Sequence, residues 1–151
     1  MNKVTKMKNL WLTHRNVLEE LLQHIHDEHL HFKPWAGAMS LSELALHVAS
    51  SNDAFVTVVK TGGKLEIPDI PECATMDDVR KTVRDFTEKT QSTYESLTEA
   101  DLEAESPIPH PKLQGKREVL LTTVYEHEIH HKGQLFVYAR MIGADSLPFF
   151  R

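Results

Sequence analysis

The sequence predicts an all-α protein built as a four-helix bundle. Apolar residues recur at intervals of three and four over four separate stretches of the chain, which is the spacing of one face of an α-helix. Clusters of Gly, Pro and polar residues separate these stretches. No segment of the chain shows the alternation of apolar and polar residues that is typical of a β-strand. Because amphipathic helices bury their apolar faces against one another, we expect a single helical domain over residues 1–151.

The first helix is predicted over about residues 5–26, and its apolar face also includes His14. Four histidines fall within residues 24–31. Such a cluster binds metal weakly at a surface, but we interpret it as a polar helix end that leads into a loop, where cationic side chains suit the helix C-terminus. A stretch with Pro and Gly, residues 33–38, follows and excludes a continuation of the helix. The apolar face of the first helix consists of Met7, Leu10, Trp11, Val17, Leu18, Leu21, Leu22 and Ile25.

The second helix is predicted from about Leu41 to Lys60. Ser40 and Glu43 match a capping box, in which a Ser side chain and a Glu three residues later satisfy N–H groups of the first turn. His47 lies on the inward face of this helix. The residues around it are small, which leaves room beside its ring. Gly62 and Gly63 are expected to end the helix.

The third helix is predicted from Thr75, where Asp78 takes the place of Glu in a second capped start, to about Leu97. Residues 98–101 are expected to begin a further short turn. Three prolines in residues 107–111 exclude a helix there, and His110 among them is expected to be exposed.

Composition and charge exclude several classes of protein. The formal net charge is -5 and there is no basic run, so nucleic acid is not expected as a partner. No apolar stretch reaches the length of a membrane span, and the first residues lack the apolar run of a signal peptide. The single cysteine, Cys73, excludes an intramolecular disulfide and fits a reducing compartment, so we expect a cytoplasmic protein.

The last helix, predicted from about Lys116 to Ile142, carries the residues that suggest a function. His127 and His131 stand four residues apart, so a helix places both imidazoles on one face, and apolar residues continue that face on either side. Two imidazoles turned into a core are costly unless they are satisfied. A divalent metal satisfies them well. The alternative is a histidine pair satisfied within a polar-lined core.

His47 from the second helix is the expected third ligand beside His127 and His131. Three neutral imidazoles leave one or more coordination positions for water or substrate, which is the pattern of a catalytic metal site. We expect Zn²⁺ or Ni²⁺, with Fe²⁺, Cu²⁺ and Mn²⁺ as alternatives. Such a metal lowers the pKa of bound water to ~7 and can hold a thiol as the thiolate.

Other residues of the last helix are candidates for supporting roles. Gln134 lies one turn beyond the histidines and is expected to orient a ligand or a bound water. Tyr138 is expected to line the pocket. Glu128 is expected to reach the groups that lie just outside the direct ligands of the metal. His130 is expected at a helix flank or a subunit contact. Gly133 costs roughly 1 kcal/mol relative to Ala inside a helix, which suggests the close approach of another backbone, from a neighbouring helix or from a partner chain.

Residues 127–131 also match H-E-x-x-H, the zinc metalloprotease signature, with Glu128 as the general base. That interpretation needs a third ligand further along the chain. No His or Glu occurs after His131, and Asp145 lies beyond the expected helix end. A protease would also offer an edge strand for the peptide, and none is predicted. We therefore disfavour a protease.

With these residues assembled, the chain resembles the DinB/YfiT-like family of small bacterial four-helix bundles. One motif is the entry to the second helix, residues 35–47. The other resembles the family's His-x-x-x-His-(Arg/Lys)-Gly-Gln signature and reads His127-Glu128-Ile129-His130-His131-Lys132-Gly133-Gln134-Leu135. The resemblance implies a divalent metal held by the matching His47, His127 and His131, and a homodimer.

The resemblance also implies a reaction, because family members with an assigned activity include transferases and isomerases that use thiols such as bacillithiol or mycothiol. Our first hypothesis is therefore a metal-dependent S-transferase that acts on a small thiol and an electrophilic substrate. The second is a non-catalytic metal-binding protein of the stress response. The third is a metal-dependent hydrolase, in which Glu128 or another carboxylate acts as the base.

Overall fold

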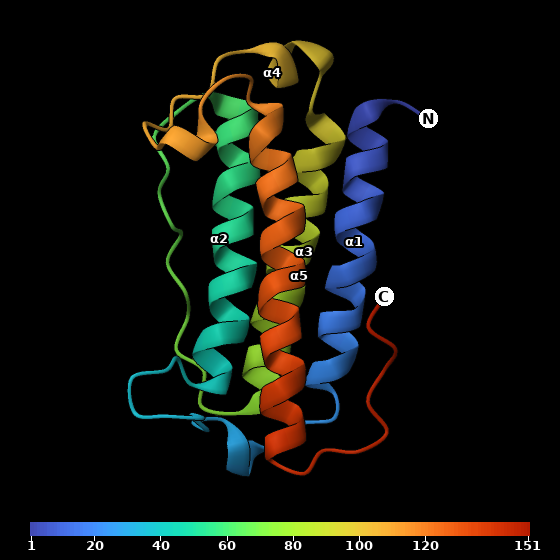
Figure 1. Ribbon diagram of the computed structural model, residues 1–151, viewed down its shortest axis with the longest axis vertical. Helices are drawn as coiled ribbons and strands as arrows, with labels where there is room; N and C mark the ends of the chain where they lie inside the picture. Colours follow the sequence, from blue (N-terminus) through green and yellow to red (C-terminus); the bar gives the residue numbers. More distant parts are fainter.

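The computed structural model describes residues 1–151 as helices joined by loops, without a strand (Figure 1). The four long helices are α1 (Lys3–Leu22), α2 (Leu41–Thr61), α3 (Met76–Ser96) and α5 (Glu118–Met141). The predicted all-α class is confirmed. The helix count needs a correction, because the expected turn at residues 98–101 forms a fifth, short helix, α4 (Glu99–Glu103). Single 3₁₀ turns occupy Asp27–His29 and Pro111–Leu113, and no helix is long and apolar enough to cross a membrane.

The helix ends follow local capping chemistry. Thr75 and Asp78 form a complete capping box at the start of α3. Ser40 Oγ accepts a hydrogen bond from the Glu43 N–H at the start of α2, which is one half of the box predicted there. α1 ends at Leu22, four residues before the predicted end, because the next N–H groups bond three residues back and the backbone at His26 is extended.

The four long helices do not follow a simple up-and-down order. α1 and α5 run in one direction, and α2 and α3 run in the other (Figure 1). α1 packs against α3 and α5, and α2 packs against the same two helices. The parallel pair α2 and α3 is joined by residues 62–75, which run along the outside of the bundle from one end to the other. As a result, α2 and α5 lie side by side although 56 residues separate Thr61 from Glu118 in the sequence.

The hydrophobic core is divided into two clusters. One cluster of 12 buried residues fills the end near α4, and another of 20 fills the opposite end. Between them lies a layer of polar residues that are at least nine-tenths buried, which we call the polar layer. It consists of His14, Arg15, Asn52, Asp53, Thr87, Thr90, Glu128 and Lys132. The histidines predicted to bind metal lie at the same height, so the polar layer and the candidate site belong to one level of the bundle.

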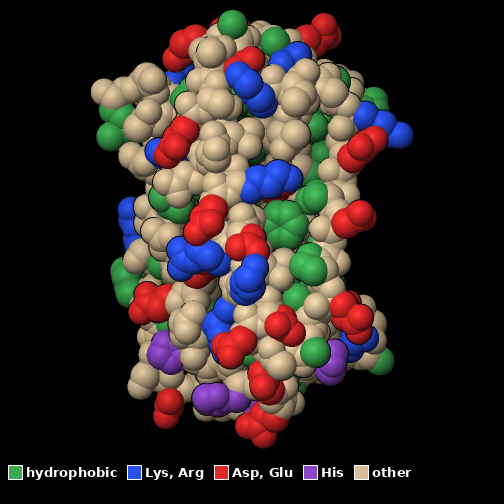
Figure 2. Space-filling view, turned by 180° about the vertical axis from the view of Figure 1, so that it is seen from behind, with side chains coloured by type: hydrophobic (Ala, Val, Ile, Leu, Met, Phe, Trp, Pro, Cys, Tyr) green, Lys and Arg blue, Asp and Glu red, His purple; other side chains and the backbone are tan.

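The surface seen from behind carries basic and acidic side chains that are interspersed over most of its height (Figure 2). The histidines visible on this face gather near the end where α1 finishes. No broad area of one charge sign is present on it.

Candidate metal centre

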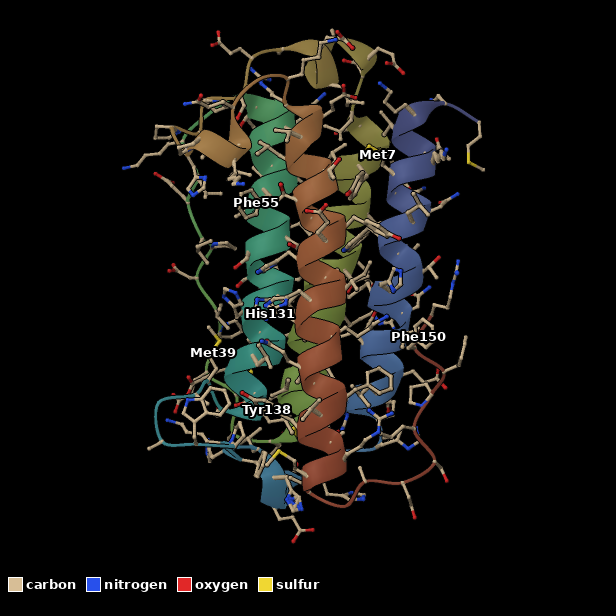
Figure 3. All side chains as sticks on the ribbon, viewed as in Figure 1. Met7, Met39, Phe55, His131, Tyr138 and Phe150 are labelled. Carbon is tan, nitrogen blue, oxygen red and sulfur yellow. The ribbon has the colours of Figure 1, made fainter.

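His47 from α2 and His127 and His131 from α5 converge where these two helices lie side by side. The ring centroids lie 5.1 Å apart for His47 and His127, 4.8 Å for His47 and His131, and 4.4 Å for His127 and His131. One nitrogen from each ring lies within 4.8 Å of the others. Figure 3 shows His131 directed from α5 toward α2. All three side chains are half-buried, so the group is reached from solvent.

The other histidines form no comparable group. The cluster at residues 24–31 does not bring three ligand atoms together, and neither does His110, which is exposed and accepts a hydrogen bond from the Lys112 N–H. His14 is buried against Lys132, as its place on the apolar face of the first helix suggested. His130 is exposed beside His131.

Each of the three converging histidines is held through Nδ1. His127 Nδ1 lies 3.0 Å from Asn52 Oδ1, and His131 Nδ1 lies 2.7 Å from Gln134 Oε1. His47 Nδ1 is 3.3 Å from Ser51 Oγ. These contacts leave Nε2 of every ring available for a ligand. A hydrogen bond at one ring nitrogen that leaves the other free is the usual arrangement of metal-binding histidines.

The contacts of Asn52 determine which nitrogen of His127 carries the proton. Asn52 Nδ2 donates to Glu128 Oε1 at 2.9 Å and to the Val124 carbonyl at 3.3 Å. Its amide nitrogen is thereby assigned, so Oδ1 must face His127 and accept a hydrogen bond. His127 therefore carries its proton on Nδ1, and the lone pair is on Nε2.

Glu128 supports this arrangement from the polar layer. Its carboxylate accepts hydrogen bonds from Arg15 Nε at 2.9 Å and Nη2 at 2.8 Å, and from Trp11 Nε1 at 2.9 Å. Glu128 and Arg15 are both fully buried. With Asn52 as a further donor, both carboxylate oxygens are occupied. A buried pair with such complete hydrogen bonding positions its neighbours, and a carboxylate so engaged is poorly suited to accept a proton from water.

Burial lowers the pKa of all three histidines below the usual range. For His127 the pKa falls to about 3, because burial disfavours the cation and the neighbouring His131 and His47 add to the effect. Burial is also the largest cause of the lowered pKa of His47 and of His131, and the hydrogen bond that His131 donates to Gln134 Oε1 opposes it at His131. All three rings are therefore neutral near pH 7, which is the form that binds a metal.

Tyr138 of α5 is expected from the sequence to line the pocket, and Gly133 is expected to be approached closely by another backbone. Tyr138 donates a hydrogen bond from its hydroxyl to the Met39 carbonyl at 3.0 Å and packs edge-on against Phe32, so it anchors the loop before α2. No neighbouring helix of this chain approaches Gly133 closely, because a Cβ placed there would meet nothing within 4 Å, and the approach of a partner chain stays a prediction. Gly133 lies on an exposed part of the helix surface.

Sequence reasoning did not find Arg15 and Asn52. Arg15 lies four residues after Trp11 and three before Leu18, within the apolar face of α1, and a charged residue in that position is the signal that could have revealed it. The partner of Arg15 lies 113 residues away, so no local pattern identifies Glu128 as that partner.

These features define an all-α bundle protein with a three-histidine group between two of its helices. The DinB family model matches residues 1–150, and the chain belongs to the DinB family, which confirms the resemblance drawn from the motifs. The chain is 38% identical over 144 residues to the protein YjoA of Bacillus subtilis, covering 93% of this chain and 92% of that one.

Solved structures agree with this assignment. The crystal structure of the DinB-like YjoA from Bacillus subtilis superposes with a TM-score of 0.84 at 35% identity and covers 97% of both chains. A DinB-like protein from Bacillus cereus gives a TM-score of 0.74 at 21% identity, covering 95% of this chain and 94% of that chain. A conserved protein from Enterococcus faecalis gives 0.70 at 14%, covering 94% and 98%. The last two similarities concern the fold alone.

Proposed function

We propose that the protein is a metal-dependent enzyme that transfers a low-molecular-weight thiol to an electrophile, with His47, His127 and His131 as the metal ligands. The observation that carries the proposal is the shared arrangement of the three rings. Each is neutral, each is held at Nδ1, and one nitrogen from each lies within 4.8 Å of the others. This donor set fits a divalent metal such as Zn²⁺ or Ni²⁺.

When bound, such a metal supplies a Lewis acid that lowers the pKa of a coordinated thiol or water. The protein's own residues orient the ligands. Asn52 keeps the proton of His127 on Nδ1, and Gln134 does the same for His131. Arg15 balances the charge of Glu128, whose carboxylate holds the Asn52 amide in place. The half-buried site leaves a path for a small thiol from solvent.

Two observations favour this function over the alternatives. A purely structural metal has a closed set of protein ligands, whereas three half-buried histidines provide three ligands at a site open to solvent. A hydrolase or protease that used Glu128 as the base would need a free carboxylate, and this one accepts hydrogen bonds from Arg15, Trp11 and Asn52.

The proposal is tested first by metal content. Tag-free protein is incubated with Zn²⁺ or Ni²⁺, desalted and measured by mass spectrometry of acid digests. We expect one metal per chain in the wild type and in the control His110→Ala, and loss of that metal in His47→Ala, His127→Ala and His131→Ala. Full metal content in any of these three variants, or little metal in the wild type, would remove the site.

The reaction is tested next, with metal-loaded protein, N-acetylcysteine and chlorodinitrobenzene. Thiol-dependent release of chloride that disappears in His127→Ala supports the transferase. Metal binding without such turnover, for a range of thiols and electrophiles, would favour the non-catalytic alternative.

A further inference from the structure

An apolar pocket adjoins the candidate metal centre on the side toward the C-terminal end of α5. It has a volume of about 380 Å³, within the range of small-molecule sites. Four of its six lining residues are hydrophobic, and none is charged. The lining consists of Pro34, Trp35, Gln134, Val137, Tyr138 and Met141.

The pocket presents apolar surface that the fold itself does not use. Trp35 is 66% exposed, Val137 is 53% exposed and Met141 is 56% exposed. Exposed apolar side chains are ordinary when scattered singly, but a contiguous group around a concavity marks a binding site. An exposed indole also offers a flat face on which another planar ring can stack.

The loop that carries Trp35 is held in place, so the pocket is preformed. The Tyr138 hydroxyl donates to the Met39 carbonyl, and Tyr138 packs against Phe32. The Leu41 N–H donates to the Phe32 carbonyl at 2.8 Å, which fixes the other end of the loop against the start of α2. A preformed site loses less conformational entropy when a ligand binds.

Gln134 connects the pocket to the metal centre. Its side chain lines the pocket, and its Oε1 lies 2.7 Å from Nδ1 of His131. A molecule in the pocket is therefore next to the residue that orients one of the proposed ligands. Because the amide is the polar group at the boundary, it can donate a hydrogen bond from Nε2 to a polar substituent of that molecule.

We propose that this pocket binds the electrophilic substrate and that this substrate is a flat, apolar carbon electrophile, such as an aromatic ring with a leaving group. The proposal rests on the thiol transfer proposed above. The thiol releases its proton to solvent, sulfur forms a bond to the ring carbon, and the bond to the leaving group breaks. A halide then departs with the bonding electron pair, and no oxidant or reductant is needed.

The size of the pocket, its uncharged lining and its position beside the metal centre argue for a small molecule. A second copy of the chain is the competing occupant, since exposed apolar residues also form subunit contacts. Occupancy of the pocket by a second copy rises with protein concentration. Occupancy by a small molecule depends on the free concentration of that molecule, and the experiment below uses this difference.

The test follows the indole N–H signals by NMR. The chain has two tryptophans, Trp35 in the pocket and Trp11 fully buried in the core, and the Trp35→Phe variant assigns their signals. m-Dinitrobenzene, which lacks the halide that the proposed reaction displaces, is titrated into metal-free protein in the absence of thiol. We expect a saturable shift of the Trp35 signal with Trp11 unchanged. Val137→Asp should remove that shift, and the control Leu10→Asp, at another exposed apolar position on α1, should keep it.

Three results would overturn the proposal. They are an unmoved Trp35 signal, a shift that Val137→Asp retains, and a Trp35 signal that changes with protein concentration and does not respond to the probe. The last of these would assign the surface to a second copy of the chain.

Kinetics separate this proposal from the function on which it rests. In metal-loaded protein, Val137→Asp should raise KM for chlorodinitrobenzene about tenfold and leave KM for N-acetylcysteine unchanged. Probe binding without turnover in the wild type would remove the proposed reaction and leave a binding pocket. Turnover that Val137→Asp does not alter would keep the reaction and remove the pocket as its substrate site.

Discussion

The two ends of the bundle and its middle are held together by different interactions. At each end, apolar side chains from all four long helices pack into a cluster. In the middle, the polar layer replaces them with the fully buried pair Arg15 and Glu128 and the hydrogen bonds of Asn52. Apolar burial stabilises without specifying direction, whereas hydrogen bonds fix the orientation of each group. The ends therefore supply stability, and the middle supplies the geometry on which the histidines depend.

The largest effect on the free energy of unfolding is expected from Glu128→Ala, which removes one partner of the buried pair. Removal of one partner leaves the Arg15 guanidinium buried without a counter-charge, so we expect a loss of about 3–5 kcal/mol in the free energy of unfolding, measured with urea. Glu126→Ala, at an exposed position of the same helix, should change it by no more than about 0.5 kcal/mol. Equal effects of the two variants would contradict the importance of the buried pair.

A double replacement sharpens the same contrast. In Arg15→Met with Glu128→Leu both charges are absent, so most of the lost stability should return. Metal affinity should stay reduced, because Asn52 has lost the acceptor that orients it. Recovery of both stability and metal affinity would show that the pair has no positioning role.

The next effect concerns metal affinity alone. Asn52→Leu removes the acceptor at His127 Nδ1 with a similar side-chain volume, and we expect metal affinity, measured by chelator competition, to fall about 10–100-fold. Ser51→Ala should cost less, because the Ser51 contact to His47 is long at 3.3 Å. The reverse order of the two variants would mean that His47, and not His127, depends most on its support.

A smaller effect, on the stability of the metal-free protein, is expected from a change of pH. His14, His47, His127 and His131 all have a pKa lowered by burial in the folded state, so below about pH 6.5 the unfolded chain binds more protons than the folded chain. The stability of metal-free protein should therefore fall from pH 7 to pH 5. Burial raises the pKa of Glu19, and this carboxyl group therefore acts in the opposite direction. Urea midpoints in the presence of a chelator measure the change.

The control for that measurement replaces His47, His127 and His131 together with Gln. The triple variant should lose most of the pH dependence and retain the parts due to His14 and Glu19. An unchanged dependence of the urea midpoint on pH would mean that groups other than these three histidines cause it.

The smallest effect is expected at the end of α1. Replacement of His24, His26, His29 and His31 by Asn should leave tightly bound metal unchanged, because this cluster does not gather three ligand atoms. Metal content of desalted protein measures this. A loss of one metal per chain would move the candidate site to that end of the bundle.

The sequence predicted more of the fold than of the site's support. Helix positions followed from periodicity and caps, and the end of α2 and the capping box at Thr75 agree closely with the structure. The convergence of His47 with the pair on α5 was predicted from their inward faces together with the resemblance. The polar layer was not, because Arg15 meets Glu128, and Asn52 meets His127, only after distant helices pack. Periodicity describes one helix at a time and contains no information about such pairs.

The path of residues 62–75 has a consequence for the speed of folding. Because this segment returns along the whole bundle, α2 and α3 are parallel and cannot form as a helical hairpin. The other main helix contacts, of α1 with α3 and α5 and of α2 with α5, join segments far apart in the chain. Bundles with local hairpins have low contact order and fold fast. This chain must close long loops before its core can form, so we expect it to fold more slowly than an up-and-down bundle of the same length.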